Sequence, residues 1–384
     1  MRIAIDYTAA IRQGAGIGSY VRYLVEALLT HDTSDRFTLL SSGRATTERP
    51  FPAGENVRGR SILVPDRYLN ILWYRWRMPI PATIFCGPTD IYHGPDFVLP
   101  PLGRRVRKVV TIHDLAFLEH PEYAVPSLAA YLQKVVPEAI AEADVVATVS
   151  QEVSRTLITH FHTPEEKLAV IPNGVAPHFR RITDPILLSA TQHKFALKHP
   201  FVLAVGTMEP RKNHLGLIKA FYQAQQKKKG PAMLAIAGGP GWLYEETRKL
   251  VEDLQLEKKV RFLGRVSDLE LITLYSMADI FAFPSFFEGF GVPPLEAMAC
   301  GTPVITSNTS SLPEVAGDAA LLVDPMNTEA LANAILRLLE DEQLREDLRQ
   351  KGYERAGQFS WAASAQKMLA VYQRLHREET VFSK

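Results

Sequence analysis

The sequence is poor in the features that mark membrane, secreted and metal-stapled proteins. Only two cysteines occur among 384 residues, Cys86 and Cys300, and neither shows metal-ligand spacing, so we expect buried free thiols in a reducing compartment. No apolar run approaches the about 18 residues that a membrane span needs, and no leader-like segment opens the chain. A formal net charge of +1 gives no reason to expect nucleic acid as a partner. The sequence therefore predicts a cytoplasmic globular protein.

What the chain has in quantity is an alternation of short apolar strands and amphipathic helices. Hydrophobic residues make up 46% and charged residues 22% of the sequence, as in ordinary globular proteins. The alternation starts at residues 2–7 and restarts at residues 201–205, after a turn-rich linker over residues 172–200. A chain of this length favours two cores over one. We therefore predict the α/β class, with two Rossmann-like domains.

The stretch of residues 283–301 has the composition of an anion-binding turn. An apolar strand ends, a loop carries Glu288 and two glycines, and Pro293 opens a helix whose first turn is predicted to contain Glu296. Free backbone N–H groups and a positive helix end would suit a phosphate or diphosphate. Such turns are common in α/β proteins, and glutamates near helix starts also act as plain dipole partners. The stretch alone leaves both interpretations open.

A second glycine loop, over residues 13–19, follows the first strand and opens a helix. A dinucleotide site would need an acidic residue at the end of the second strand, roughly twenty residues beyond the loop. Asp32 and Asp35 come before that strand, so the sequence does not support cofactor binding by Gly16 and Gly18 in this way.

Positive charge is concentrated in the first half of the chain. Residues 36–108 contain twelve Arg or Lys against five acids, and residues 67–77 combine aromatic rings with cations. This composition fits an interfacial helix at an anionic membrane surface. It also fits a solvated basic face and a core-packed helix whose arginines snorkel to water.

Polar residues follow two further predicted strands at the positions where parallel sheets bind ligands. His113 comes directly after the strand over residues 107–112, and Arg211 and Lys212 follow the strand over residues 201–205. Alone, the histidine could equally be structural and the two cations a solvated turn. The polar segment over residues 306–311 is predicted to lie beside the stretch that carries Glu288.

Glu288 and Glu296 are separated by seven residues within EGFGVPPLEAMACGTPVI. This pattern resembles the E-x7-E signature of retaining glycosyltransferases of family 4, and TIHDL, VGTMEPRKN and LGRV resemble other segments of that family. The resemblance implies the GT-B fold, with two Rossmann-like domains facing each other across a cleft. It assigns acceptor binding to residues 1–176 and nucleotide-sugar binding to residues 177–360. The helix within residues 361–384 is expected to cross back onto the first domain.

The resemblance also implies the roles of the site residues. Arg211 and Lys212 would clamp the donor diphosphate, Glu288 and His113 would contact the transferred sugar, and Glu296 would bind ribose hydroxyls. Backbone groups of the turns would supply the remaining donor contacts, from Gly289, Phe290, Gly291, Gly206, Val266, Gly16 and Gly18, with His93 as a secondary candidate. Many family members carry arginine where this chain has Thr207, and in our interpretation Arg211 takes its place.

The implied reaction retains the anomeric configuration, and the departing phosphate oxygen accepts the proton of the acceptor. The sequence contains no Asp-x-Asp motif, by which metal-dependent glycosyltransferases of the other common fold hold their ion. Since Arg211 and Lys212 can stabilise the leaving diphosphate, we expect no metal and no cofactor.

VGTMEPRKN is similar to segments of bacterial mannosyl- and glucosyltransferases of surface polysaccharide synthesis. GDP-mannose or UDP-glucose is therefore the expected donor, and a glycan or lipid-linked saccharide the expected acceptor, with peripheral contact at the inner membrane face as a further hypothesis. Two alternatives share the architecture: a nucleotide-sugar epimerase, which needs no acceptor, and a catalytically silent partner of a transferase complex. A glycosidase using Glu288 and Glu296 would leave Arg211 and Lys212 without a purpose.

Overall fold

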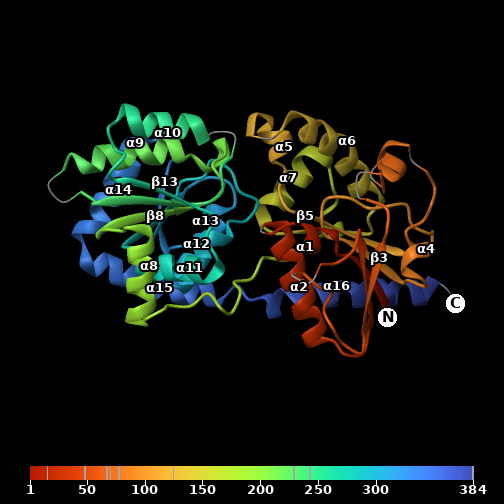
Figure 1. Ribbon diagram of the computed structural model, residues 1–384. Helices are drawn as coiled ribbons and strands as arrows, with labels where there is room; N and C mark the ends of the chain where they lie inside the picture. The colour runs from red at the N-terminus through yellow and green to blue at the C-terminus, as the bar shows by residue number, and fades with distance from the viewer. Residues whose placement is uncertain are drawn as a thin grey trace. The chain divides into compact units, whose positions relative to one another are not determined.

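The computed structural model of the protein describes residues 1–14, 16–46, 49–65, 68–69, 71–76, 78–123, 125–227, 230–241 and 244–382. The chain forms two compact units (Figure 1). The first unit combines residues 1–174 with residues 361–384, and the second unit is residues 175–360. Each unit is built on one parallel sheet, which confirms the predicted α/β class.

The first unit has a seven-stranded sheet in the order β3-β2-β1-β4-β5-β6-β7, and every neighbouring pair is parallel. The chain adds strands on one side of β1 and then returns to its other side, so the topological switch point lies between β1 and β4. The strands are β1 (Arg2–Asp6), β2 (Arg36–Ser42), β3 (Val57–Ile62), β4 (Ile91–Gly94), β5 (Arg107–Ile112), β6 (Val145–Thr148) and β7 (Leu168–Val170).

The helices of the first unit come from both ends of the chain. They are α1 (Thr8–Arg12), α2 (Ile17–His31), the π-helical turn η1 (Ile71–Arg75), α4 (Thr83–Cys86), α5 (Ala116–Glu119), the 3₁₀ turn η2 (Pro121–Tyr123), α6 (Pro126–Glu142), α7 (Gln151–Phe161), the 3₁₀ turn η3 (Glu165–Lys167) and α16 (Trp361–Phe382). Figure 1 shows α16, in blue, beside α2, in red, and the two helices pack on each other. Within this unit the Tyr372 hydroxyl of α16 is hydrogen-bonded to Nδ1 of His93 in β4 at 2.7 Å. The C-terminal helix is therefore part of the first core.

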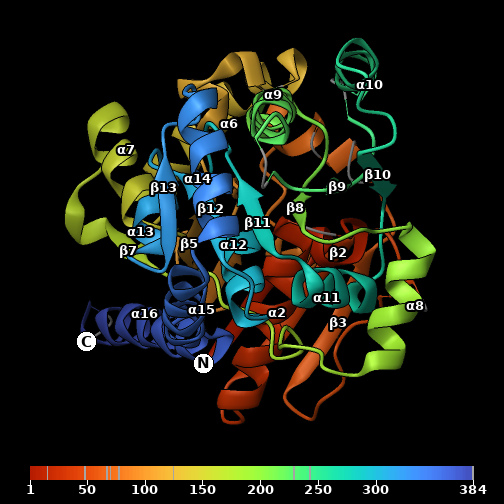
Figure 2. The same cartoon turned by 90° about the vertical axis from the view of Figure 1, so that its left-hand side faces the viewer.

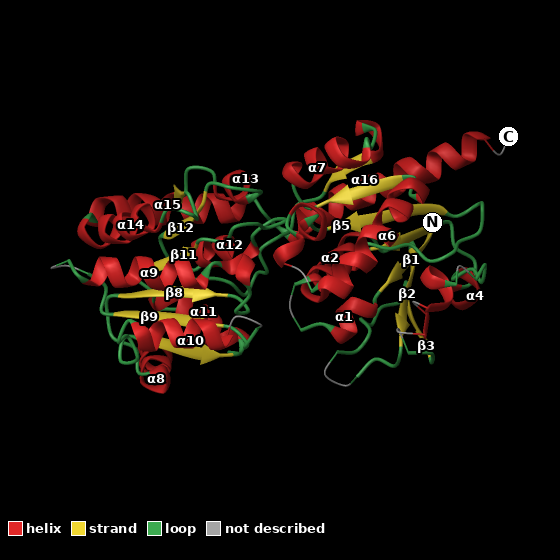
Figure 3. Cartoon of the chain, turned by 90° about the horizontal axis from the view of Figure 1, so that it is seen from above, coloured by secondary structure: helices red, strands yellow, loops and turns green. Residues whose placement is uncertain are grey.

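The second unit has a six-stranded parallel sheet in the order β10-β9-β8-β11-β12-β13. Figure 2 shows its strands one after another, from β13 at one edge to β10 at the other. Its switch point lies between β8 and β11. The strands are β8 (Phe201–Val205), β9 (Met233–Ala237), β10 (Val260–Gly264), β11 (Ile280–Phe283), β12 (Val304–Ser307) and β13 (Ala320–Val323). The helices are α8 (Pro185–Phe195), the 3₁₀ turn η4 (Pro210–Lys212), α9 (His214–Gln225), α10 (Tyr244–Asp253), α11 (Asp268–Met277), α12 (Val292–Ala299), α13 (Leu312–Ala316), α14 (Thr328–Glu340) and α15 (Glu342–Gly357). Figure 3 shows β8 and β9 as arrows running in one direction between these helices.

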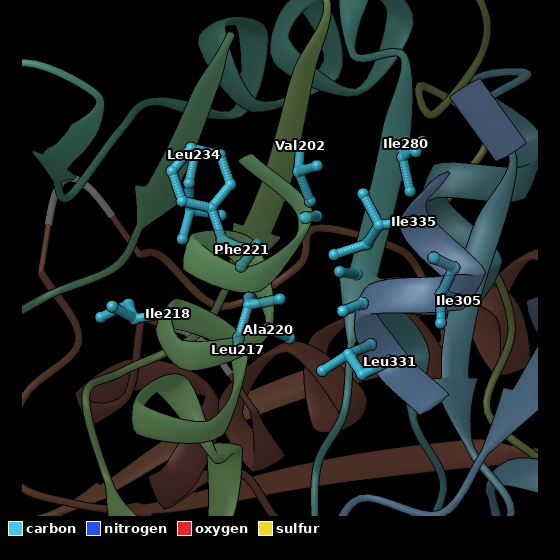
Figure 4. Packing of buried hydrophobic residues seen from close by; sticks show 14 of the residues in the cluster. Val202, Leu217, Ile218, Ala220, Phe221, Leu234, Ile280, Ile305, Leu331 and Ile335 are labelled. Atoms are coloured by element: carbon cyan, nitrogen blue, oxygen red, sulfur yellow. The ribbon is translucent and has the colours of Figure 1, made fainter. Parts of the chain in front are cut away.

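The core of the second unit lies between one face of its sheet and the helices α9 and α14. Val202 and Ile280 of neighbouring strands meet Phe221 of α9 and Ile335 of α14, and all four side chains are fully buried (Figure 4). Burial of large aliphatic and aromatic side chains contributes about 1.5 to 3 kcal/mol each. This face therefore holds the sheet rigid, and with it the loops at the carboxyl ends of its strands.

The structure adds to the sequence analysis at three points. Residues 57–62, for which no strand was predicted, form the edge strand β3, in which residues 58–61 are exposed and give no apolar signal. Of the helix expected over residues 67–77, the structure describes α-helical Tyr68 and Leu69 and the turn η1, whereas Arg67, Asn70 and Arg77 lie outside the described residues. The linker segment over residues 172–200 contains the helix α8.

Two further observations concern composition. Cys86 and Cys300 are both buried and unpaired with each other, as predicted. Among the described residues no helix is long and apolar enough to cross a membrane.

Candidate functional site

The carboxyl ends of β8 and β11 meet at the switch point of the second unit. Arg211 and Lys212 stand in the turn η4 after β8, and Glu288 stands in the loop after β11. The two loops are joined through their backbones, because the N–H of Phe286 donates to the carbonyl of Arg211 at 2.9 Å. The fold therefore brings Glu288 to Arg211 and Lys212, which precede it by 77 and 76 positions in the sequence.

Glu288 bridges the two cations. Its Oε1 accepts from Nζ of Lys212 at 2.6 Å and its Oε2 accepts from Nη1 of Arg211 at 2.5 Å. The same Nη1 donates to the carbonyl of Phe287 at 3.2 Å, and the Lys212 ammonium lies 4.8 Å from the centre of the Phe283 ring. Guanidinium and ammonium groups offer five and three N–H donors. One pair of cations can therefore hold Glu288 and phosphate oxygens together.

Burial and charge act in opposite directions on this cluster. Burial disfavours the ionised form of Glu288, but the charges of Arg211 and Lys212 outweigh it and hold the pKa of Glu288 below its usual range. Burial, followed by the like charge of Arg211, lowers the pKa of Lys212, while Glu288 opposes the shift. The cluster therefore keeps its carboxylate ionised at neutral pH.

A row of hydroxyl groups fixes the loop that carries Glu288. The segment over residues 306–311 donates to carbonyls of residues 283–290, with Thr309 bound to Phe286 at 3.0 Å and Ser311 bound to Glu288 at 2.8 Å. Further bonds of the same kind are Thr306 to Phe283, Ser307 to Ser285 and Ser311 to Phe290. The Ser310 hydroxyl accepts from the backbone N–H of Glu288 at 3.1 Å. The predicted neighbourhood of the two segments is confirmed, but the hydroxyl ladder itself has no local sequence signal.

Glu296 lies in the same unit but not where the sequence predicted. The helix α12 begins at Val292, so Glu296 is its fifth residue and the prediction of a first-turn position was wrong. Its Oε2 accepts from the Tyr275 hydroxyl at 3.0 Å. Burial raises the pKa of Glu296 to about 7, although this hydrogen bond opposes the shift. Glu296 can therefore change its charge near neutral pH, and Tyr275 is a site residue that the sequence analysis missed.

The glycines of this site allow close backbone approaches. A Cβ on Gly291, whose φ is 101°, would lie 2.6 Å from a methyl carbon of Leu312. Gly206 has a φ of 144°, and a Cβ there would meet the aliphatic chain of Lys212 at 3.4 Å. Gly289 and Phe290 stand between the two glutamates, with the Phe290 ring buried against Phe359. These residues shape the turn around the charge cluster.

Val266 and Thr207 also follow strands of this sheet. Val266 lies between β10 and Ser267, which caps α11 with a reciprocal hydrogen-bonded pair involving Glu270. The loops after β8 and β9 are joined by a hydrogen bond from the N–H of Met208 to the carbonyl of Gly239. Thr207 stands in this joined loop, directly after Gly206.

The predicted residues of the first unit have local structural roles. Gly18 is the second residue of α2, where a Cβ would lie 2.3 Å from the Gln13 carbonyl oxygen, and Gly16, the N-cap of α2, has a φ of 59°. His113 donates through Nε2 to the Pro95 carbonyl at 2.7 Å, which leaves Nδ1 as the acceptor nitrogen. Burial lowers the pKa of His113, so the ring is neutral.

His93 is a core residue. It is fully buried, with Nδ1 bound to Tyr372 and Nε2 within 2.8 Å of the Thr111 hydroxyl, and burial lowers its pKa to about 3. One ring nitrogen therefore binds α16 and the other binds the neighbouring strand β5. In the part of the chain that the structure describes, no group of three or more His, Cys, Asp or Glu side chains is arranged to hold a metal ion.

Comparisons with known proteins agree with this architecture. Anabaena HepE, solved in complex with UDP and glucose, superimposes with a TM-score of 0.72 at 19% identity, over 97% of this chain and 100% of that one. The protein is therefore of the GT-B class, with two parallel-sheet units.

The sequence comparisons define the family. The profile of glycosyl transferases group 1 matches residues 189–355, and that of glycosyltransferase family 4 matches residues 14–179. O-antigen chain mannosyltransferase B of Escherichia coli is 36% identical over 285 residues, which are 74% of either chain. D-inositol 3-phosphate glycosyltransferase of Corynebacterium glutamicum is 33% identical over 241 residues, 60% of this chain and 57% of that protein. The chain belongs to glycosyltransferase family 4, and it is a glycosyltransferase.

Proposed function

We propose that the protein transfers a hexose from a nucleotide-diphosphate sugar to a glycan or lipid-linked saccharide during polysaccharide biosynthesis. The observation that carries the proposal is the cluster of Arg211, Lys212 and Glu288 at the switch point of the second unit. GDP-mannose and UDP-glucose are the donors of choice. The E. coli relative is named a mannosyltransferase, and the Anabaena protein binds UDP and glucose.

The chemistry requires stabilisation of the charge that develops on the leaving diphosphate. Arg211 and Lys212 would hold its oxygens, and the backbone N–H groups before α12 would add oriented donors. Glu288 would accept a hydrogen bond from the transferred sugar, and Glu296 from the ribose hydroxyls. Because two fixed cations supply the positive charge, the proposed reaction needs no divalent metal.

The proposed reaction proceeds with retention of the anomeric configuration. The bond between the anomeric carbon and the phosphate oxygen breaks on the face where the acceptor oxygen attacks, and the departing phosphate oxygen takes the acceptor's proton. His113 would contact the donor sugar as a neutral acceptor through Nδ1. No separate protein base is required in this scheme.

We also propose that the protein acts in the cytoplasm, at the inner face of the membrane. The exposed side chains of Leu63, Trp76 and Ile84, each more than 60% accessible, come from the same basic part of the first unit as exposed Arg58 and Arg60. Rings and cations of this kind suit an anionic lipid surface.

Co-sedimentation with vesicles tests the membrane hypothesis. The protein should pellet with phosphatidylglycerol vesicles but not with phosphatidylcholine vesicles, and R58E/R60E should weaken pelleting. The control K198E/K249E changes the same charge on exposed residues of the second unit. Equal pelleting of both double variants would contradict a specific role for Arg58 and Arg60.

A transfer assay tests the main proposal. Purified protein is given GDP-mannose or UDP-glucose and a neutral oligosaccharide, with and without EDTA, and the anomeric configuration of the product is read by NMR. We expect an α-linked product from either α-linked donor, in the presence of EDTA. K212A should abolish transfer, whereas K351A, which alters an exposed ion pair with Asp318, should not. Conversion of the donor alone would favour the epimerase, and no binding of donor would favour the silent partner.

A further inference from the structure

A second carboxylate stands beside the cations Arg211 and Lys212. Glu209 directly precedes the turn η4, and its Oε2 lies 3.7 Å from Nη2 of Arg211. At this distance the pair interacts through charge rather than through a hydrogen bond. The side chain of Glu209 is 32% exposed, so its carboxylate is accessible from solvent. No step of the proposed transfer uses this carboxylate.

The local sequence fixes Glu209 next to Arg211. Pro210 restricts the residue before it to an extended backbone, and Glu209 has a φ of −111° and a ψ of 153°. The N–H of Glu209 donates to the Thr207 carbonyl at 2.8 Å, and its own carbonyl accepts from the N–H of Lys212 at 3.1 Å. The turn therefore holds the carboxylate as a close neighbour of the guanidinium.

Two carboxylates share the two cations. Nη1 of Arg211 donates to Glu288, whereas its Nη2 lies beside Glu209. Burial, followed by the like charge of Arg211, lowers the pKa of Lys212, and the charges of both glutamates oppose the shift. The adjacent His214 adds no charge, because burial and the charge of Lys212 lower its pKa to about 4. Two positive charges therefore face two negative ones.

The proposed reaction changes the charge of the ligand at these cations. In the sugar nucleotide the terminal phosphate is esterified to the sugar, whereas in the product it is a free monoester with a second pKa of about 6. At neutral pH the product therefore carries more negative charge than the donor. A carboxylate beside the cations repels both ligands, and it repels the product more strongly. We infer that Glu209 promotes release of the nucleoside diphosphate by repelling its terminal phosphate, an inference that rests on the proposed glycosyl transfer.

The two glutamates differ in burial and in bonding. Glu288 is buried and is hydrogen-bonded to both Arg211 and Lys212, so it holds the cations in place. Glu209 is more exposed and lies beyond hydrogen-bond distance of the guanidinium. Replacing Glu209 by glutamine leaves Arg211 bound to Glu288 and to the Phe287 carbonyl. E209Q should therefore change the charge of the cluster and leave its arrangement intact.

Titration calorimetry of the whole protein tests the inference with GDP, UDP, GDP-mannose and UDP-glucose as ligands. E209Q should lower the Kd for the nucleoside diphosphate about 3- to 10-fold, because a partly exposed charge acts here on a multiply charged ligand. The Kd for the matching sugar nucleotide should fall by a smaller factor. In stopped-flow measurements a fluorescent GDP or UDP derivative should dissociate more slowly from E209Q, and in the transfer assay the free diphosphate should inhibit E209Q more strongly.

Two variants serve as controls. E209D keeps the negative charge, and its Kd for the nucleoside diphosphate should lie closer to the native value than that of E209Q. E252Q removes another partly exposed carboxylate of the second unit, which lies 3.8 Å from the guanidinium of Arg248. Because this pair lies on α10, away from the charge cluster, E252Q should leave every binding constant unchanged.

The outcomes separate the inference from the proposed function. An unchanged or higher Kd for the nucleoside diphosphate in E209Q would overturn the inference, since loss of structure weakens binding whereas loss of repulsion strengthens it. Equal strengthening of donor and product binding would also overturn it. If the product binds more tightly to E209Q as expected but no sugar is transferred, the charge effect stands and the proposed transfer fails. If neither GDP nor UDP binds the native protein, both fail.

Discussion

Replacing Glu288 by glutamine probes the charge cluster most directly. The substitution keeps the size of the side chain but removes a negative charge that contacts both Arg211 and Lys212. Breaking a fully buried ion pair costs about 3 to 5 kcal/mol. Here the side chains of Arg211 and Lys212 are 21% and 13% exposed, and glutamine retains hydrogen bonding, so we expect a loss of about 2 to 3 kcal/mol.

Differential scanning calorimetry measures this loss. For a unit of this size the melting temperature of the second unit should fall by roughly 4 to 12 °C at pH 7. The pKa of Glu288 is lowered from 4.5 in the folded state, so its contribution is present at neutral pH and is lost as the pH falls through the folded pKa. The gap between E288Q and the unsubstituted protein should therefore close in acid. D318N, which removes an 82% exposed partner of Lys351, is the control and should shift the transition little.

A nucleoside diphosphate should partly rescue E288Q, because its phosphates would return negative charge to the two cations. The gap in melting temperature should narrow at saturating GDP or UDP. A shift under about 1 °C at pH 7 would show that the cluster contributes little to stability, since one kcal/mol corresponds to about 2 to 4 °C. A gap that no nucleotide changes would refute the diphosphate clamp.

Three further predictions follow from buried groups. The pKa of Glu296 is raised to about 7, so its carboxylate becomes ionised, and a stronger acceptor for ribose hydroxyls, as the pH rises through 7. The affinity for GDP or UDP should therefore rise more steeply between pH 6 and 8 in the native protein than in E296Q. Isothermal titration calorimetry measures both affinities. Y372F removes the hydroxyl bound to His93 and should destabilise the first unit by about 1 to 3 kcal/mol in urea unfolding. F221A empties a fully buried site and should destabilise the second unit by about 3 to 5 kcal/mol. Equal slopes of affinity against pH in the native protein and E296Q would contradict the first argument. An unchanged unfolding transition of the first unit in Y372F would contradict the second, and a loss of unfolding free energy under about 1 kcal/mol in F221A would contradict the third.

The elements with local signals were predictable from the sequence. Strands such as residues 201–205 are continuous apolar runs because both faces of a parallel sheet are covered, and the turn chemistry after them marks their ends. The loop carrying Glu288 could be found for the same reason, since its glycines and prolines are local breakers. The edge strand β3 was missed because its four central residues are exposed, so the sequence lacks the apolar run that marks a buried strand.

Contacts that depend on tertiary structure had no such signal. The hydrogen bond between Tyr275 of α11 and Glu296 of α12 joins two residues that are 21 positions apart. Composition alone does not identify Tyr275 as the partner of Glu296. The segment over residues 306–311 has the composition of any polar loop. Its hydroxyl groups nevertheless bind specific backbone groups about 22 residues earlier, which are carbonyls for all of them except Ser310, whose partner is the N–H of Glu288. The start of α12 was misjudged by one residue, because a helix with two prolines near its start can begin before them; this places Glu296 just beyond the first turn.

The return of α16 to the first unit determines the order in which the protein can be completed during synthesis. The hydrogen bond between His93 and Tyr372 cannot form until Tyr372, 279 residues later in the sequence, has left the ribosome. The second unit, by contrast, is one uninterrupted segment of the chain. At about 5 to 20 residues per second, the ribosome needs roughly 10 to 40 s to make that segment. Throughout this time the first sheet lacks its last helix and exposes the surface that α16 will cover. The second unit, although it is made later, can therefore finish folding first. A truncation before residue 361 would leave the first unit without α16 and incompletely folded.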